Sequence, residues 1–93
     1  MPYIGTFETK NSDWFKLEDL IKESKPDFAF DVNKKYTIQV IKDVRTLESD
    51  VEPTAADAGF YIDDLEKFKY EPIAGYSLYV KSHTWDNRIT VGE

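Results

Sequence analysis

The chain has 93 residues with a formal net charge of −6, and 41% of them are hydrophobic and 15% aromatic. This length leaves room for one hydrophobic core, and the apolar content argues against disorder although 32% of the residues are charged. The absence of cysteine excludes disulfides and thiolate sites and fits synthesis in a reducing compartment.

The first 27 residues differ in character from the rest. Tyr3–Phe7 has the composition of a short strand or an ordered arm. Asn11–Asp13 offers side chains that cap helices, and apolar residues then recur at helical spacing: Trp14, Leu17, Leu20 and Ile21. Because Pro26 disfavours helical backbone at the residue before it, an amphipathic helix is predicted from about Ser12 to Ser24.

After Pro26 the hydrophobic period changes from 3.6 to 2. Short alternating runs rich in aromatic and β-branched residues predict strands at residues 28–32, 35–41, 44–48, 59–62, 67–70, 76–84 and 88–91, the last two as a hairpin. Gly59 and Gly75 occupy turn positions that need positive φ. The pattern predicts a mainly β fold: a small antiparallel sandwich or barrel of six to seven short strands with one N-terminal amphipathic helix.

This division predicts an N-terminal arm and helix at residues 1–27 and a β module at residues 28–93. The N-terminus has no basic region followed by an apolar run, and no stretch approaches the roughly 20 apolar residues of a membrane span. A soluble intracellular product with no membrane association is therefore expected.

Negative charge is concentrated in residues 47–66, which contain no Lys or Arg. The acidic residues there are Glu48, Asp50, Glu52, Asp57, Asp63, Asp64 and Glu66. Binding to a nucleic-acid backbone needs a basic stripe that displaces counterions, and none is visible, so direct nucleic-acid binding is not expected. The acidic stretch itself fits either a solvated loop, which we favour, or a mimic of DNA.

Residues that could carry chemistry are few. His83 is the only histidine, so a nucleophile–base pair would have to be built around it, and a surface or loop histidine is the favoured interpretation. The carboxylate pairs Asp63/Asp64 and Asp50/Glu52 fit turns better than glycoside hydrolysis or Ca²⁺ binding. No phosphate-binding, dinucleotide-binding or zinc motif occurs. The chain is therefore predicted not to be an enzyme and to use no cofactor or metal.

Five segments follow one another in a distinctive order of strands and turns. The first is a turn and an aromatic-Thr-Ile-Gln strand, and the set is Asn33–Gln39, Glu52–Phe60, Phe68–Pro72, Ala74–Ser82 and Arg88–Val91. In this order, residues 30–93 resemble a small β module of virion structural proteins of tailed bacteriophages, among capsid decoration, head-fibre and tail proteins. The chain has Lys34 and Lys35 where that module has a glycine, and residues 1–27 lie outside the resemblance.

The resemblance implies a non-enzymatic phage virion structural protein, made in the host cytoplasm and located in the virion. The leading hypothesis is a capsid decoration (cement) protein that forms a homo-oligomer, a trimer as the first guess, and clamps neighbouring capsid subunits. Its partner would be the major capsid protein or another virion protein.

Attachment or oligomerisation is predicted at aromatic residues of the N-terminal segment: Tyr3, Phe7, Trp14 and Phe15. The alternative that the helix only covers one open end of the sheet, with Trp14 in the core, stays open. Two other functions are considered. One is a small acidic phage protein that inhibits a host protein through residues 48–66, and the other is a glycan-binding module built on Tyr79, His83 and Trp85.

Overall fold

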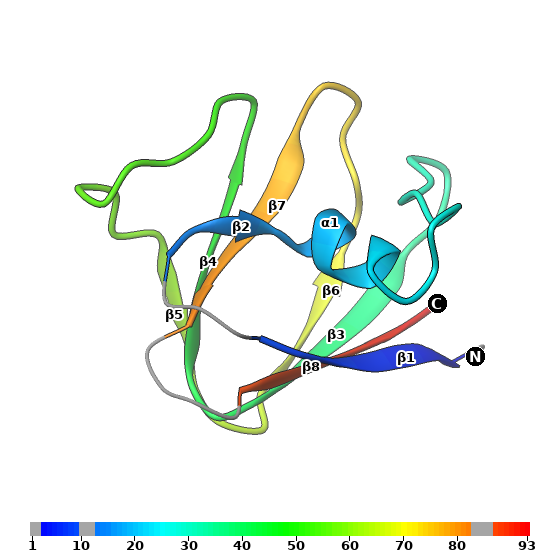
Figure 1. The fold of residues 1–93 in the computed structure, drawn as a ribbon, viewed down its shortest axis with the longest axis horizontal. Helices are drawn as coiled ribbons and strands as arrows, with labels where there is room; N and C mark the ends of the chain where they lie inside the picture. Colours follow the sequence, from blue (N-terminus) through cyan, green and yellow to red (C-terminus); the bar gives the residue numbers. More distant parts are fainter. Residues whose placement is uncertain (1–2, 10–12, 83–86) are drawn as a thin grey trace.

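A computed structural model describes residues 3–9, 13–82 and 87–93 (Figure 1). Within these residues the protein is mainly β, as predicted, with one short helix, α1 (Leu17–Lys22). The strands are β1 (Tyr3–Glu8), β2 (Phe15–Lys16), β3 (Tyr36–Ile41), β4 (Val44–Ser49), β5 (Phe60–Ile62), β6 (Lys67–Tyr70), β7 (Ser77–Ser82) and β8 (Arg88–Gly92). The predicted count of six to seven strands is wrong, because the described residues form eight.

The strands form two four-stranded antiparallel sheets. Sheet A has the order β1-β8-β3-β6 and sheet B the order β2-β7-β4-β5. Among the described strands, only β4 and β5 follow one another along the chain within a single sheet. Every other connection passes from one sheet to the other, so strands that pair are mostly far apart in sequence, as Thr6 of β1 is from Thr90 of β8.

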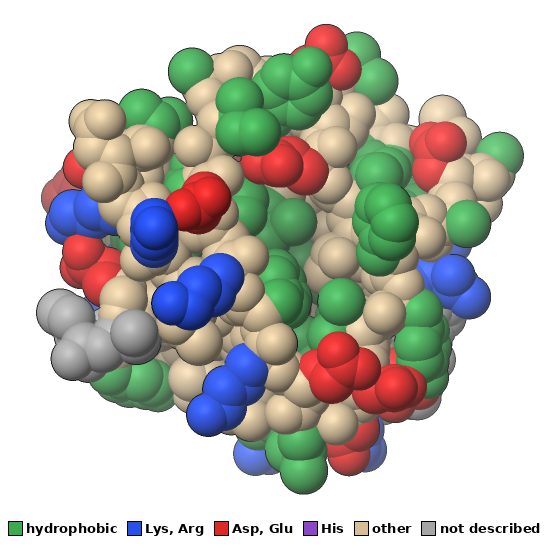
Figure 2. Space-filling view, turned by 180° about the vertical axis from the view of Figure 1, so that it is seen from behind, with side chains coloured by type: hydrophobic (Ala, Val, Ile, Leu, Met, Phe, Trp, Pro, Cys, Tyr) green, Lys and Arg blue, Asp and Glu red, His purple; other side chains and the backbone are tan. Residues whose placement is uncertain are grey.

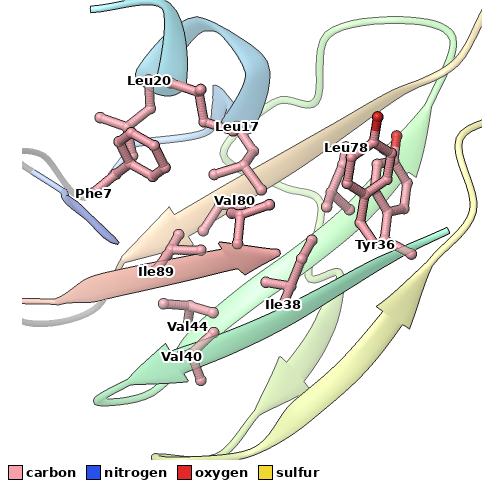
Figure 3. Close-up of a cluster of buried hydrophobic side chains, with 13 residues drawn as sticks. Phe7, Leu17, Leu20, Tyr36, Ile38, Val40, Val44, Leu78, Val80 and Ile89 are labelled. Carbon is pink, nitrogen blue, oxygen red and sulfur yellow. The ribbon is translucent and has the colours of Figure 1, made fainter. Parts of the chain in front are cut away.

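One hydrophobic cluster receives side chains from both sheets and from α1 (Figure 3). β3 shows the expected alternation, with Tyr36, Ile38 and Val40 buried and the residues between them half-buried. Leu17 and Ile21 are completely buried, and Phe7 of β1 lies next to Leu20. Burying an aliphatic side chain of this size contributes about 1.5–3 kcal/mol, so α1 is part of the core.

The helix is shorter than predicted and begins five residues later, at Leu17 instead of about Ser12. Phe15 and Lys16 pair with β7, and extended backbone in this pair prevents an earlier helix start. Lys16 is the N-cap residue and makes no side-chain capping hydrogen bond. Of the predicted capping residues, Asp13 precedes the helix, whereas Asn11 and Ser12 fall outside the described residues.

Residues 28–32, predicted as a strand, do not form one. Phe30 instead makes edge-to-face contacts with Phe28, Tyr36 and Tyr70 at ring-centroid distances of 5.0, 4.8 and 5.0 Å. The alternating phenylalanines therefore pack as an aromatic cluster beside the core.

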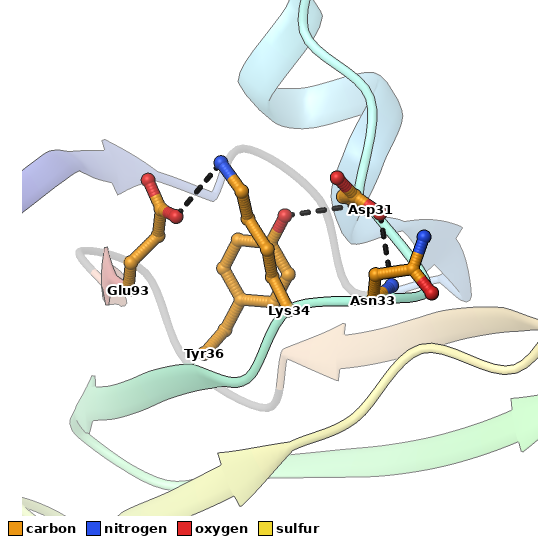
Figure 4. A network of polar contacts seen from close by, with 5 residues as sticks. All are labelled: Asp31, Asn33, Lys34, Tyr36 and Glu93. Carbon is orange, nitrogen blue, oxygen red and sulfur yellow. Dashed lines mark hydrogen bonds and ion pairs between the residues drawn. The ribbon is translucent and has the colours of Figure 1, made fainter.

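Hydrogen bonds hold the chain in turns after this aromatic cluster (Figure 4). The Asp31 amide donates to the Tyr36 hydroxyl at 2.9 Å, and the Asn33 amide donates to Asp31 Oδ1 at 2.8 Å. Lys34 Nζ lies 2.9 Å from Glu93 Oε1, and this hydrogen bond raises the pKa of Lys34. The Tyr36 hydroxyl thus accepts a hydrogen bond from the Asp31 amide, which in a strand would donate to a backbone carbonyl.

The predicted hairpin of residues 76–84 with 88–91 is wrong. β7 pairs with β2 and β4 in sheet B, whereas β8 pairs with β1 and β3 in sheet A. Asn87, just before β8, is completely buried. Its Nδ2 donates to the Asp43 carbonyl at 2.7 Å, its Oδ1 accepts from Ser82 Oγ at 2.8 Å, and its carbonyl accepts from the Thr9 amide at 2.9 Å. Asn87 therefore ties together three cross-sheet connections.

Candidate interaction surface

The four aromatic residues of the predicted interface lie in different environments. Tyr3 is 68% exposed on β1, whereas Phe7 is buried in the core. Trp14 is 9% exposed and Phe15 is half-buried on β2. Within the described residues, Trp14 and Phe15 line one pocket, whereas Tyr3 and Phe7 each line a different one. Their role in attachment stays a prediction.

β1 and β2, both from the N-terminal segment, are strands of the same two sheets as the later part of the chain. The division into residues 1–27 and 28–93 as an arm and a module stays a prediction. Physically, the N-terminal segment contributes an outer strand to each sheet, a helix to the core, and the wall of the pocket described next.

A cavity of about 380 Å³ opens beside β2. We call it the aromatic pocket; it is lined by Trp14, Phe15, Lys16, Asp19, Glu52 and Tyr79. These residues come from β2 and the residue before it, α1, β7, and the loop between β4 and β5. Because four separate segments contribute, the pocket exists only in the folded chain.

Tyr79 lines the aromatic pocket from β7, a strand that is covered on both faces. Leu78 and Val80 face the core, so Tyr79 points to the opposite face of sheet B, where it is nevertheless 5% exposed. Across the strands, Tyr79 is aligned with Lys16 of β2 and Leu47 of β4. The three consecutive buried residues in β7 show that other parts of the chain cover this outer face as well.

The loop between β4 and β5 returns to the sheet at Gly59, against the indole of Trp14. Gly59 has φ +65°, as predicted for a glycine turn. A Cβ on Gly59 would lie 2.6 Å from Cη2 of Trp14 and 2.8 Å from the Thr46 carbonyl oxygen. Only glycine therefore allows this close approach of loop and indole.

Polar groups of the aromatic pocket carry two negative formal charges, on Asp19 and Glu52, and one positive charge, on Lys16. One of the residues that line the pocket also has a buried polar atom without a partner among the described residues. Trp14 Nε1 is buried and has no hydrogen-bond acceptor among the described residues. Indole Nε1 is a donor only, so any partner it gains has to be an acceptor.

A second polar group is buried beside the aromatic cluster. Burial, followed by the charges of Glu48 and Glu18, raises the pKa of Tyr70 to about 12. Glu48 lies on the same side of β4 as the core residue Val44, and its Oε2 is buried with no partner among the described residues. The first residue of the acidic stretch therefore points inward.

Other acidic residues of the stretch hold loops in place. Asp64 Oδ1 accepts from the Lys42 amide at 2.6 Å, and Asp57 Oδ2 accepts from the Thr54 amide at 2.8 Å. Glu66 Oε1 accepts from the Asp63 amide at 3.2 Å. On the face shown in Figure 2, acidic side chains are scattered around a row of Lys and Arg side chains. Acidic side chains therefore do not form one continuous face there.

Several candidate chemistries from the sequence can be located only in part. His83 and Trp85 fall outside the described residues, and Tyr79 is buried. In the described parts of the chain, no cluster of three or more His, Cys, Asp or Glu residues could hold a metal ion. No helix in those parts has the length and apolar character needed to cross a bilayer.

Comparisons of the chain with protein-family models, curated proteins and solved structures found no match.

The sequence places Trp14 and Phe15 among four predicted interface residues but does not indicate Asp19, Glu52 and Tyr79 as their neighbours. Tyr79 is predicted only as a possible glycan contact, together with His83 and Trp85 in one hairpin. No local pattern links residue 52 to residue 14, because the topology of sheet B and the loop after β4 bring them together. An unusually small residue, Gly59, was the one visible signal of a close approach in this region.

Proposed function

We propose that the two sheets form a small jelly-roll sandwich. Support comes from the strand order, β1-β8-β3-β6 and β2-β7-β4-β5, which is the order of two interleaved Greek keys. A single hydrophobic cluster fed by both sheets also fits a sandwich.

On this basis we propose that the protein is a non-enzymatic structural component of a phage virion, made in the host cytoplasm. The most specific form is a capsid decoration (cement) protein bound to the major capsid protein. The strand order carries the proposal, since jelly rolls recur in viral capsid domains, and it adds to the resemblance of residues 30–93. Jelly rolls also occur in lectins and cupins, so the fold supports this function by analogy.

Attachment would use the surface around the aromatic pocket. Phe15, half-buried at its wall, is the aromatic residue there that a partner can still cover. Binding energy at protein interfaces concentrates in a few aromatic and arginine contacts, and truncating one such residue costs about 2 kcal/mol or more.

The inhibitor hypothesis is less well supported. It requires residues 48–66 to present one acidic face, yet Glu48 points inward and Asp57, Asp64 and Glu66 accept hydrogen bonds within their own loops. The glycan-binding hypothesis shares the jelly-roll fold and becomes an outcome of the tests below.

Cosedimentation with purified phage capsids tests the main proposal. The wild-type chain should pellet with capsids at a saturable ratio, and Phe15→Ala should reduce binding by about 30-fold, the ratio for 2 kcal/mol. Tyr76→Ala, which removes a 47% exposed ring elsewhere, is the matched control and should bind normally. Absence of pelleting with capsids, and equally with tails, would contradict a virion role.

The proposed homo-oligomer has a separate test. Small domains gain stability from partner surfaces, and light scattering should show more than one chain per particle, with a trimer as the first expectation. A monomer at high protein concentration would contradict this part of the proposal. Edge strand β6 is an improbable contact, since Lys67 and Lys69 are both exposed on it and such lysines oppose edge-to-edge pairing.

A further inference from the structure

We propose that the aromatic pocket binds the guanidinium group of an arginine side chain on a protein partner. The inference rests on the proposed attachment function only for the statement that the arginine belongs to a partner protein. The pocket itself, its rings and its carboxylates are described above independently of any function.

The rings of the aromatic pocket suit a planar cation. Phe15 is half-buried at the wall and presents ring surface to the pocket, while Trp14 and Tyr79 are both at least nine-tenths buried and support it from below. Aromatic rings attract cations through their negative faces, and arginine is the side chain found most often in this role. Its planar guanidinium can stack on a ring while its N–H groups point elsewhere.

The carboxylates supply acceptors for those N–H groups. Asp19 and Glu52 approach the pocket from α1 and from the loop after β4, so they line it from separate segments. Charge-assisted hydrogen bonds from guanidinium to carboxylate are roughly twice as strong as neutral ones. No ion pair to either carboxylate is present among the described residues, so both acceptors remain for a ligand.

Trp14 Nε1 is a second, independent observation at this site. It is a buried donor without an acceptor among the described residues, on a side chain that lines the pocket. Guanidinium has no acceptor, but the main chain that carries an arginine has carbonyl groups. A peptide segment with one arginine therefore carries donors for the carboxylates and acceptors of the kind that the indole lacks.

A sugar fits the pocket less well. The formal charges of Asp19, Glu52 and Lys16 sum to −1, which favours a cation over a neutral ligand.

The test follows the indole Nε1–H signal of Trp14 by NMR in the full chain. The chain has two tryptophans, so a Trp85→Phe variant assigns the signals. The probes are N-acetyl-arginine methylamide, its neutral isostere N-acetyl-citrulline methylamide, and methyl glucoside. The arginine compound should shift the Trp14 signal saturably, with citrulline binding about tenfold or more weakly and the glucoside having no effect. Equal binding of arginine and citrulline, or a shift with the glucoside alone, would overturn the proposal.

Charge-removing variants locate the site. Asp19 and Glu52 are both exposed, so Asp19→Asn with Glu52→Gln should fold normally and weaken arginine binding about tenfold. Asp27→Asn with Glu71→Gln removes the same charge away from the pocket and should leave binding within about twofold of the wild type. Wild-type binding by the first double variant would overturn the proposal.

The two proposals can fail separately. If the Asp19→Asn, Glu52→Gln variant still pellets with capsids as the wild type does, the arginine site is refuted as the attachment point while the virion role stands. If arginine binds as described but the chain does not pellet with any virion part, the virion role is refuted and the pocket remains.

Discussion

Trp14, for which the sequence left both attachment and a place in the core open, is buried in the structure. It precedes the helix, lines the aromatic pocket and contacts the backbone position of Gly59. The burial of Leu17 and Ile21 favours the interpretation in which this segment covers the sheet. Phe15, the proposed attachment residue, is thus the direct neighbour of a buried residue, Trp14.

Replacing Trp14 by Ala should destabilise the whole fold by about 3–5 kcal/mol, the usual effect of truncating a buried large aromatic residue. Urea unfolding, with the free energy of unfolding extrapolated to water, measures this. Phe15→Ala, at a half-buried ring, should have the smaller effect. An unchanged unfolding midpoint for Trp14→Ala together with lost capsid binding would return Trp14 to the role of a pure anchor.

Gly59 and Gly75 allow a matched test of close approach. Both have positive φ, +65° and +84°, but a Cβ on Gly75 would meet nothing within 4 Å. Gly75→Ala should therefore cost about 1–2 kcal/mol from backbone strain alone. Gly59→Ala adds the clash with Trp14 and the Thr46 carbonyl, about 1–3 kcal/mol more. Thermal unfolding of the two variants checks this, and equal destabilisation would show that the loop can move away.

At the scale of elements, Asn87 joins parts of both sheets through one buried amide. Asn87→Ala leaves the Asp43 carbonyl and the Ser82 hydroxyl without this partner, and unsatisfied buried groups cost about 1–3 kcal/mol each. We expect a loss of about 2–4 kcal/mol of folding free energy, again by urea unfolding. Ser82→Ala removes one of these bonds from the other side and should cost less, because the Asn87–Asp43 bond remains.

Tyr70 connects β6 to the charges on β4 and α1 and makes stability depend on alkaline pH. Burial, then Glu48 and Glu18, raises its pKa to about 12, whereas an unfolded tyrosine has a pKa of about 10. Between these values the unfolded chain loses the proton and the folded chain keeps it, so stability falls as pH rises from about 10 to 12. Below pH 10 neither state is ionised and the effect is absent.

Tyr70→Phe should therefore flatten the loss of stability between pH 9 and pH 11 relative to the wild type, as measured by urea unfolding at each pH. Tyr76→Phe, which removes a hydroxyl from a 47% exposed ring, is the control and should leave the pH dependence as in the wild type. An identical pH dependence in the wild type and Tyr70→Phe would show that Tyr70 ionises normally.

Element boundaries show what sequence could and could not predict. Alternation located β3, β4 and β6 because their side chains face the core and the outer side of the sheet in turn. It failed at residues 28–32, where the apolar residues form an aromatic cluster, and at Phe15–Lys16, where pairing with β7 overrides a helical pattern. In both places a partner distant in sequence decided the local structure.

At the scale of the whole molecule, strand pairing was the least predictable property. Adjacent runs 76–84 and 88–91 were the obvious hairpin, yet they entered different sheets. The candidate site has the same dependence, since Asp19, Glu52 and Tyr79 meet only when sheet B is complete. The residue types therefore predicted the fold class and named two residues of the aromatic pocket, Trp14 and Phe15. The strand topology brings the other lining residues to them.

The pairing of the first strand with the last has a consequence for how the chain can fold. β8 lies between β1 and β3, so sheet A lacks a central member until residues 88–92 have been synthesised. Folds dominated by such distant pairings fold in milliseconds to seconds, far more slowly than helical bundles. On the ribosome, β3 and β6 can pair early, whereas β1 would stay separate from them until residues 88–92 have been synthesised and can lie between β1 and β3.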